Sequence, residues 1–306
     1  MFARTRITFL SVSIFLLLAG CVAQAQTQAN CTVNLFSLTP PSTAWIYPSA
    51  VNDSGTIVGL VQVPTPEQNV AFVQWSNGGI NFPFGKHKVS LLSGRNDNGT
   101  SIGYSGVGQT PVFLNGFDAP FLMGTPVLLN GTTSTPITFS VPTGTLNVNG
   151  INNFGSIVGA GNIGDLKFHG FKRWSNGNVA ILDYPGAVQT VPTSINDSGA
   201  VVGYYTDSSG QSHGFLYVNG KWATLNYPKA AGTSLVGISN AGLIVGNANV
   251  NGAQTAFIYQ KGTFKFFWII NNPSNSVYVM DGISARKGHI LITNVIWGQG
   301  FTATCQ

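Results

Sequence analysis

A nine-residue pattern recurs six times along the chain and limits its possible folds more than any other feature. Its clearest copy is Ile195–Gly203, in which an apolar residue precedes an Asn-Asp-x-Gly turn and an apolar run that ends in glycine. The first glycines of the six copies lie at positions 55, 99, 155, 199, 242 and 288, so successive copies are 44, 56, 44, 43 and 46 residues apart. Repeats with periods of about 20–50 residues stack into solenoids, propellers or similar arrays.

Each repeat is expected to contain four short strands. The Asn-Asp-x-Gly turn and the dipeptide Asn219-Gly220 favour tight hairpins, because these residues tolerate positive φ. Pro228 cannot donate to a sheet and therefore ends the last strand of the fourth copy. The strands predicted for that copy are Thr193–Ile195, Ala200–Tyr205, His213–Val218 and Lys221–Tyr227. Four antiparallel strands in ~44 residues are typical of a propeller blade, whereas three-stranded solenoid coils are usually shorter.

The second repeat is longer than the others. Its second apolar run is assigned to Val112–Leu114, but the segments Pro111–Gly116 and Pro126–Gly131 are near-duplicates (PVFLNG and PVLLNG). The stretch Phe117–Thr125 between them is therefore predicted to be an inserted loop or an alternative turn.

The two ends of the chain complement each other. The sixth repeat supplies three strands and stops near Cys305, whereas Cys31–Leu38, ahead of the first repeat, resembles the missing fourth strand. We therefore predict an all-β fold, a six-bladed β-propeller whose last blade is closed by the N-terminal strand. Residues 31–306 would form this single domain. An open solenoid would give the two ends no reason to meet.

The first residues have the features of an export signal. Arg4 and Arg6 precede a short apolar run, Ile7–Leu18, which is too short to span a bilayer comfortably. Two processing sites remain open. The sequence Leu-Ala-Gly-Cys ending at Cys21 resembles a lipobox, which would remove residues 1–20 and lipidate Cys21, whereas Ala23-Gln24-Ala25 fits ordinary cleavage of residues 1–25. Either site predicts an extracytoplasmic protein, secreted or anchored to a membrane through Cys21.

Export also predicts a disulfide bond. Apart from Cys21, the chain has two cysteines, Cys31 and Cys305, and an exported protein meets an oxidising environment. The alignment of the two ends places both cysteines at the same hairpin of the last blade. We therefore predict that Cys31 and Cys305 form a disulfide.

Charge and acid content exclude several functions. Charged residues make up 8% of the chain, and the basic ones are scattered, so no nucleic-acid partner is expected. The chain holds nine acidic residues, and three of them, Asp53, Asp97 and Asp197, occupy one turn position of the repeat. We interpret these three as turn residues rather than as the convergent carboxylates that glycoside hydrolysis needs.

Histidine, arginine and tryptophan give only weak candidate sites. His169 and His213 recur at one strand edge and are expected to pack or hydrogen-bond, because a metal would need a third ligand nearby. The arginines outside the signal could form an anion clamp. They are Arg95, Arg173 and Arg286. Tryptophans near the third-to-fourth strand turn either pack between blades or stack on a ligand. They are Trp75, Trp174 and Trp222. No cofactor, metal ligand or catalytic residue is assigned.

The tripeptide His-Gly-Phe, complete at His169–Phe171 and His213–Phe215, resembles the signature of the HAF-repeat proteins, a family of exported bacterial repeat proteins. The pattern is reduced to Ala-Phe at Ala71-Phe72 and Ala256-Phe257, and the resemblance extends over residues 45–300. It implies an extracytoplasmic location, and it transfers no catalytic site because the motif is a repeat signature.

These observations favour a non-catalytic binding or scaffold module outside the cytoplasm. Its partner would be a glycan, a peptide or a protein. The alternative is a carbohydrate-active hydrolase or lyase that uses the mouth of the propeller channel, which the scarcity of acidic residues disfavours.

Overall fold

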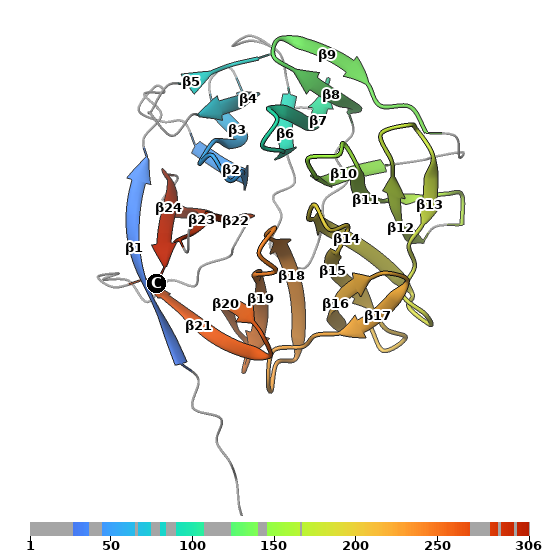
Figure 1. Cartoon of the computed structure of the whole chain (residues 1–306), viewed down its shortest axis with the longest axis vertical. Coiled ribbons are helices and arrows are strands. Elements are labelled where there is room, and N and C mark those ends of the chain that lie inside the picture. Colours follow the sequence, from blue (N-terminus) through green and yellow to red (C-terminus); the bar gives the residue numbers. More distant parts are fainter. Residues whose placement is uncertain are drawn as a thin grey trace, which may run out of the picture.

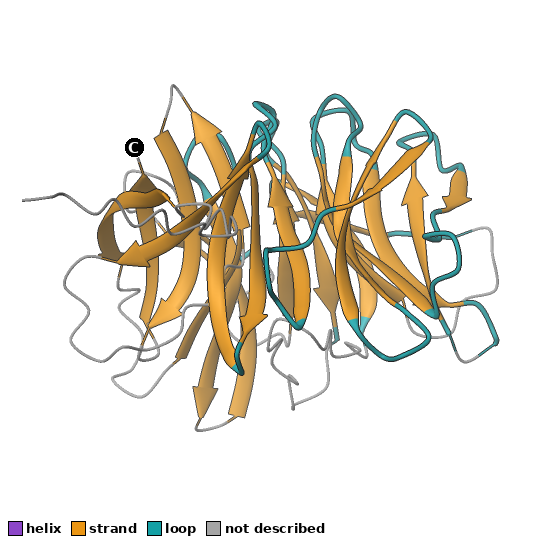
Figure 2. Cartoon of the chain, turned by 90° about the horizontal axis from the view of Figure 1, so that it is seen from below, coloured by secondary structure: helices purple, strands orange, loops and turns teal. Residues whose placement is uncertain are grey.

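The computed structural model describes residues 27–36, 45–64, 67–74, 80–83, 90–106, 124–139, 146–165, 167–269, 282–286, 289–296 and 299–305. Every regular element in these ranges is a β-strand (Figure 2). This part of the chain contains no helix that could span a membrane. The sheets stand around a common centre, with the first strand of each repeat innermost (Figure 1).

The first four repeats each form one antiparallel sheet of four strands. The first contains β2 (Trp45–Val51), β3 (Ile57–Pro64), β4 (Glu67–Gln74) and β5 (Ile80–Asn81). The second contains β6 (Ser90–Arg95), β7 (Thr100–Ser105), β8 (Thr125–Asn130) and β9 (Thr133–Pro136). The third contains β10 (Leu146–Ile151), β11 (Ile157–Asn162), β12 (Phe168–Arg173) and β13 (Val179–Ile181). The fourth contains β14 (Gln189–Ile195), β15 (Val201–Thr206), β16 (Ser212–Val218) and β17 (Lys221–Thr224).

The remaining strands form a single eight-stranded sheet. In spatial order these are β18 (Gly232–Ile238), β19 (Ile244–Val250), β20 (Ala253–Gln260), β21 (Thr263–Ile269), β1 (Thr27–Phe36), β24 (Gln299–Cys305), β23 (His289–Ile296) and β22 (Gly282–Arg286).

The prediction of six blades, the last closed by the N-terminal strand, is therefore wrong, and the structure is a propeller of five blades. The reason lies in β1, whose ten residues exceed the length of one blade edge. Thr27–Cys31 pairs in parallel with β21, and Cys31–Phe36 pairs antiparallel with β24. Because one strand joins both neighbours, it does not complete a separate sixth blade, and the last two repeats merge into one wide blade.

Strand positions within a repeat agree with the prediction at the hairpins and differ at the outer ends. In the fourth repeat β14 begins at Gln189, four residues before the predicted start, and β17 ends at Thr224, three residues before the predicted end. In the second repeat the third strand is β8, Thr125–Asn130, so the second of the two near-duplicate segments takes this place. The assignment to Val112–Leu114, which lies outside the described residues, is therefore wrong.

In the first, third, fourth and fifth repeats, a glycine on the second strand lets the sheet close tightly over an aromatic ring. A Cβ on Gly203 would lie 2.1 Å from the carbonyl oxygen of Val191 and 2.9 Å from the ring of Phe215. Phe215 itself is fully buried. Gly59, Gly159 and Gly246 stand in the same relation to a phenylalanine of the third strand. The recurring glycine is thus needed because the phenylalanine of His-Gly-Phe packs directly against it.

The core lies between neighbouring blades. Val158 and Leu182 of the third repeat pack with Ile195, Val201 and Phe215 of the fourth. Full burial of each such side chain contributes about 1.5–3 kcal/mol. Contacts of this kind fix the inner strands relative to one another, and the inner strands carry the candidate site.

Candidate functional site

Each inner strand ends at the same turn. In the fourth repeat the backbone N–H of Asn196 donates to the oxygen of Ala200 at 3.1 Å, and Gly199, with φ of 80°, donates to the oxygen of Asn196 at 3.0 Å. The Asn196 Oδ1 atom accepts the N–H of Ala200 at 3.0 Å, which closes the turn from inside. The same arrangement recurs at Asn52, Asn96 and Asn152.

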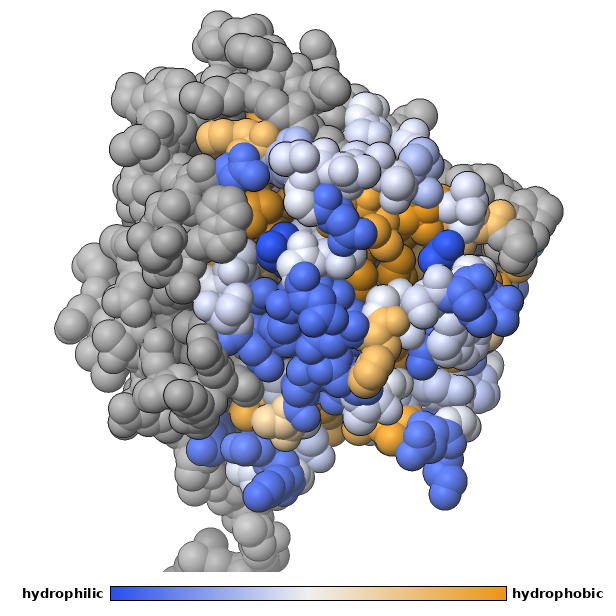
Figure 3. Space-filling model, turned by 45° about the horizontal axis from the view of Figure 1, so that its top comes forward, coloured by the Kyte–Doolittle hydropathy of each residue, from blue (hydrophilic) through white to orange (hydrophobic). Residues whose placement is uncertain are grey.

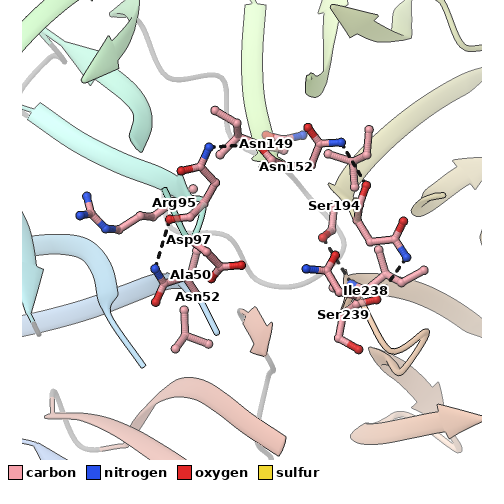
Figure 4. Close-up of a pocket in the computed structure, with 18 of the residues that line it drawn as sticks. Ala50, Asn52, Arg95, Asp97, Asn149, Asn152, Ser194, Ile238 and Ser239 are labelled. Carbon is pink, nitrogen blue, oxygen red and sulfur yellow. Dashed lines mark hydrogen bonds between the residues drawn. The ribbon is translucent and has the colours of Figure 1, made fainter. Parts of the chain in front are cut away.

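The first residue of each turn also ties its repeat to the next one. The Nδ2 atom of Asn52 donates to the backbone oxygen of Asn96 at 3.1 Å, and Asn96 donates to Asn152 at 3.0 Å. Asn152 donates to Asn196 at 3.1 Å, and Asn196 donates to Ser239 at 3.2 Å. These five buried residues form what we name the asparagine ring (Figure 4).

A second layer lies one residue further along, and we name it the mouth ring. Its members are Asp53, Asp97, Asn153, Asp197 and Asn240. The first four members each donate their backbone N–H to a side-chain oxygen of the following member, at 2.7, 2.8, 2.9 and 2.8 Å in order from Asp53 to Asn240. Two of the three aspartates, Asp97 and Asp197, are therefore more than turn residues, because each accepts a hydrogen bond from the preceding repeat.

Asn153 is the centre of the mouth ring. Its Nδ2 atom donates to Oδ2 of Asp97 at 2.9 Å and to Oδ2 of Asp197 at 2.8 Å. Asn240 donates to the same oxygen of Asp197 at 2.8 Å. The two carboxylates are thus compensated by neutral amide donors, and the ring keeps negative charge at the end of the channel.

Below the asparagine ring, a one-residue β-bulge interrupts each described inner strand of the first five repeats. A bulge re-aims a side chain, and here the bulged residues line the channel. They are Ser49, Ser93, Asn149, Thr193 and Val236. Ser93 Oγ donates to the oxygen of Val148 at 2.6 Å, and Thr193 Oγ1 donates to the oxygen of Leu235 at 2.8 Å.

The two rings and the bulged residues enclose a polar cavity of about 100 Å³ at the channel mouth. A cavity needs roughly 10–15 Å³ to hold one water molecule, so this one accepts several waters or one small polar group. Arg95, at the edge of the lining, points away from the ring in Figure 4 and donates to Ser101 Oγ at 2.8 Å. In the space-filling view, hydrophilic residues form one area in the middle of the displayed face, with hydrophobic residues beside it (Figure 3).

The hydrogen-bond pattern determines which ligands this cavity suits. The hydroxyl protons of Ser93 and Thr193 and the amide protons of Asn153 are directed at protein oxygens. These groups present lone pairs on hydroxyl and carboxylate oxygens to the cavity, and the hydroxyl of Ser194, which accepts the N–H of Ile238 at 3.3 Å, adds a donor. The mouth is therefore complementary to a ligand that is rich in hydrogen-bond donors, such as hydroxyl groups.

The two repeat histidines lie on the outer side of separate blades. His169 places Nδ1 2.6 Å from Asp183 and Nε2 3.0 Å from Asp165. Because ionised carboxylates only accept, this arrangement favours the imidazolium form of the ring, in which both nitrogens donate. Burial lowers the pKa of His169, but the hydrogen bonds to the two carboxylates and their negative charge outweigh it, so the pKa is raised.

His213 differs at one partner. Its Nε2 atom lies 2.9 Å from Asp207, while Nδ1 lies 2.9 Å from the amide nitrogen of Asn226. The orientation of that amide is fixed because its oxygen accepts the N–H of Gly214 at 3.1 Å. Among the described residues, no group of three histidine, cysteine, aspartate or glutamate side chains could hold a metal ion.

Other sequence candidates do not converge. Arg95 belongs to the second repeat and donates to Ser101, whereas Arg173 belongs to the third repeat and donates to the backbone oxygen of Thr138 at 3.2 Å. The two arginines therefore have separate partners. Trp222 packs against Tyr184, Phe215 and Tyr217. Trp174 is 39% exposed. The side chains of several candidates lie outside the described residues. They are Cys21, Cys31, Trp75, Arg286 and Cys305.

Sequence reasoning missed the bulged residues and the bonds between repeats. A signal for the bulges was present, because the same repeat position is polar in four copies: Ser49, Ser93, Asn149 and Thr193.

The backbone of the two cysteines is described, and Cys31 lies directly opposite Cys305 in the β1–β24 pair.

Comparisons with known proteins identify the fold alone. No protein-family model and no curated protein sequence matches the chain. A presumed TolB from Agrobacterium tumefaciens gives a TM-score of 0.56 at 11% identity, over 91% of this chain and 99% of that one. A presumed gluconolactonase gives 0.55 at 10% identity, over 92% and 94%. TolB from Acinetobacter baumannii gives 0.53 at 12% identity, over 82% of this chain and 64% of that one. At these identities the similarity establishes a β-propeller fold and carries no function.

Proposed function

We propose that this protein is an exported, non-catalytic binding module and that its ligand is held at the channel mouth. The observation that supports this most is the concentration of oxygen acceptors from five repeats around one small polar cavity. A ring of turns tied to one another by hydrogen bonds is rigid. Rigid, pre-oriented groups reduce the ordering cost of binding.

The same geometry disfavours the alternative of a carbohydrate-active hydrolase. A glycosidase needs one carboxyl that holds a proton as acid and a second that acts as base or nucleophile. Asp97 and Asp197 each accept hydrogen bonds from a backbone N–H and from an amide N–H. Both carboxyl groups are thus engaged in the hydrogen bonds that join neighbouring repeats.

Export is part of the same proposal. The signal-like segment of residues 1–25, with Cys21 as a lipidation site in one of its two versions, and the resemblance to HAF-repeat proteins both support an extracytoplasmic location. The partners suited to that location are a glycan, a peptide or another protein.

The test is a binding screen followed by analysis of the bound ligand. Purified mature protein is applied to a glycan array and a peptide array, and any bound oligosaccharide is then incubated with the protein and examined by mass spectrometry. We expect saturable binding with the ligand recovered intact. Cleavage of the oligosaccharide would support the hydrolase, and absence of binding on both arrays would count against a binding module.

A further inference from the structure

We propose that the ligand of the channel mouth is a sugar and that Phe154 is the surface on which the sugar ring stacks. This inference rests on the proposed function, because it names the ligand class of the same site. It starts from Phe154 because this turn position is small or polar in the other described repeats.

Phe154 is 68% exposed, the largest value among the exposed large hydrophobic residues of the described chain. The corresponding position in the other repeats holds Ser54, Asn98, Ser198 and Ala241, which are small or polar. Ser54 and Ser198 use their hydroxyls to donate to the asparagine of their own turn, each at 2.7 Å. Phe154 cannot make this bond, so the turn forgoes a hydrogen bond and exposes an aromatic ring to water instead.

The position of Phe154 suggests a role for its exposed ring in ligand binding. Phe154 directly follows Asn153, whose amide contacts both Asp97 and Asp197. One repeat earlier, the side chain at this position reaches the mouth ring, because Asn98 donates to the backbone oxygen of Asn153 at 2.8 Å. By the same path the side chain of Phe154 would extend from the mouth ring toward the next repeat, beside Asn153 and just outside the residues that line the cavity.

An aromatic face beside a set of oxygen acceptors is complementary to a sugar. A pyranose has one face of C–H groups, which packs on an aromatic ring, and an edge of hydroxyls, which donate to carboxylate and hydroxyl oxygens. The cavity of about 100 Å³ is too small to enclose a whole sugar. The sugar would thus lie across the mouth, with one hydroxyl group directed inward and its ring over Phe154.

A peptide fits this site less well. A peptide backbone brings one N–H donor with each carbonyl acceptor, whereas every hydroxyl along a sugar edge can donate to the carboxylates of Asp97 and Asp197. A peptide rich in basic groups would supply further donors, and Phe154 would then add a cation–π contact.

The test compares Phe154→Ser with Phe154→Tyr in the full mature protein. The probes are the methyl glycosides of glucose, galactose, mannose, fucose and N-acetylglucosamine together with a glycan array, and binding is measured by saturation-transfer NMR and calorimetry. Phe154→Ser restores the residue found in two sister repeats, so its melting temperature should equal or exceed that of the natural protein. We expect it to bind the sugar at least about tenfold more weakly, and Phe154→Tyr to keep the affinity.

The outcomes separate this inference from the proposed function. Binding of a sugar that Phe154→Ser leaves unchanged would overturn the inference while the binding module stands. Binding of basic peptides with no sugar bound would also overturn the inference and leave the module in place. No binding of any probe by the natural protein would count against both.

Discussion

The asparagine that begins a turn stabilises both its own turn and the contact with the next repeat. Asn152 accepts the N–H groups of Phe154 and Ser156 with its oxygen, at 3.1 and 2.9 Å, and donates to the next repeat with its nitrogen. The side chain is 5% exposed, so water cannot easily replace these partners. One residue therefore shapes its own turn and fixes the distance to the neighbouring blade.

Replacement of Asn152 by alanine should destabilise the protein by about 2–4 kcal/mol, because it leaves buried backbone groups without partners. Asn98→Ala is the matched control, since it removes one exposed hydrogen bond near the same channel mouth and should change stability by less than about 0.5 kcal/mol. Urea unfolding of both variants measures the difference. Equal effects of the two substitutions would contradict the role of the asparagine ring.

His169 makes stability depend on pH. Its pKa is raised in the folded protein, so its stabilising contribution is complete below the unfolded value of about 6.5 and is lost as the pH rises through the folded value. The groups around it are two carboxylates, of Asp165 and Asp183, and otherwise an apolar slot lined in part by Phe171 and Ile181.

Asp183→Asn tests this, because it recreates the partner that His213 has in Asn226. The stability lost in the variant should be largest near pH 5–6 and should shrink at higher pH. Urea unfolding of both proteins from pH 5 to 9 gives that difference, and NMR titration of His169 should show a higher midpoint in the natural protein than in the variant. A stability difference that is constant with pH would contradict the imidazolium assignment.

At this scale the sequence predicted residue types better than residue roles. The Asn-Asp-x-Gly pattern predicts a turn because those residues tolerate its backbone angles, and the turns are there. The side-chain bonds between repeats could not be predicted, because they depend on how far apart neighbouring inner strands lie. Phe154 was visible only as an irregular copy of the repeat.

Among the elements, β1 has the largest effect on the architecture. It joins β21 and β24, which belong to different repeats, and so makes one sheet of eight strands. The repeat spacing predicted the hairpins of each unit from local signals. It could not predict the parallel pairing of Thr27–Cys31 with β21, because that pairing involves residues outside the repeat.

The register of β1 and β24 supports the predicted disulfide between Cys31 and Cys305. Directly opposed residues of an antiparallel pair have Cα atoms about 4.5–5.5 Å apart, which is within the range that a disulfide spans. For so long a loop the chain-entropy model gives a stabilisation of roughly 5 kcal/mol as an upper value. Cys305→Ser, or reduction, should therefore lower the melting temperature.

Peptide mapping without reductant on protein purified from the periplasm or the medium identifies the bond directly. We expect a linked pair of peptides that contain Cys31 and Cys305. Two free thiols in that material would contradict the predicted disulfide. Ligand binding should not change on reduction, because β23 separates β1 and β24 from the innermost strand of this repeat, β22.

For the molecule as a whole, the export route decides where the site is presented. Processing at the lipobox would anchor the propeller through Cys21, whereas cleavage after Ala25 would release it. A single acyl chain binds membranes only marginally, so stable partition requires the several chains of a lipoprotein. Globomycin and Cys21→Ala should both change processing and membrane partition if the lipobox is used. If neither does, the protein is not a lipoprotein.

The central claim is that the ligand occupies the channel mouth. Val236 lines the cavity at a bulge position and is the apolar member of that set, so Val236→Trp should fill the cavity and leave the hydrogen-bonded rings in place. Val188→Trp, at a position that is 45% exposed and outside the cavity lining, is the control. The decisive measurement is calorimetric titration of both variants with the sugar selected on the glycan array. We predict that Val236→Trp binds at least about tenfold more weakly while Val188→Trp binds like the natural protein; equal affinity of all three, with Val236→Trp folded, would place the ligand elsewhere and contradict the account.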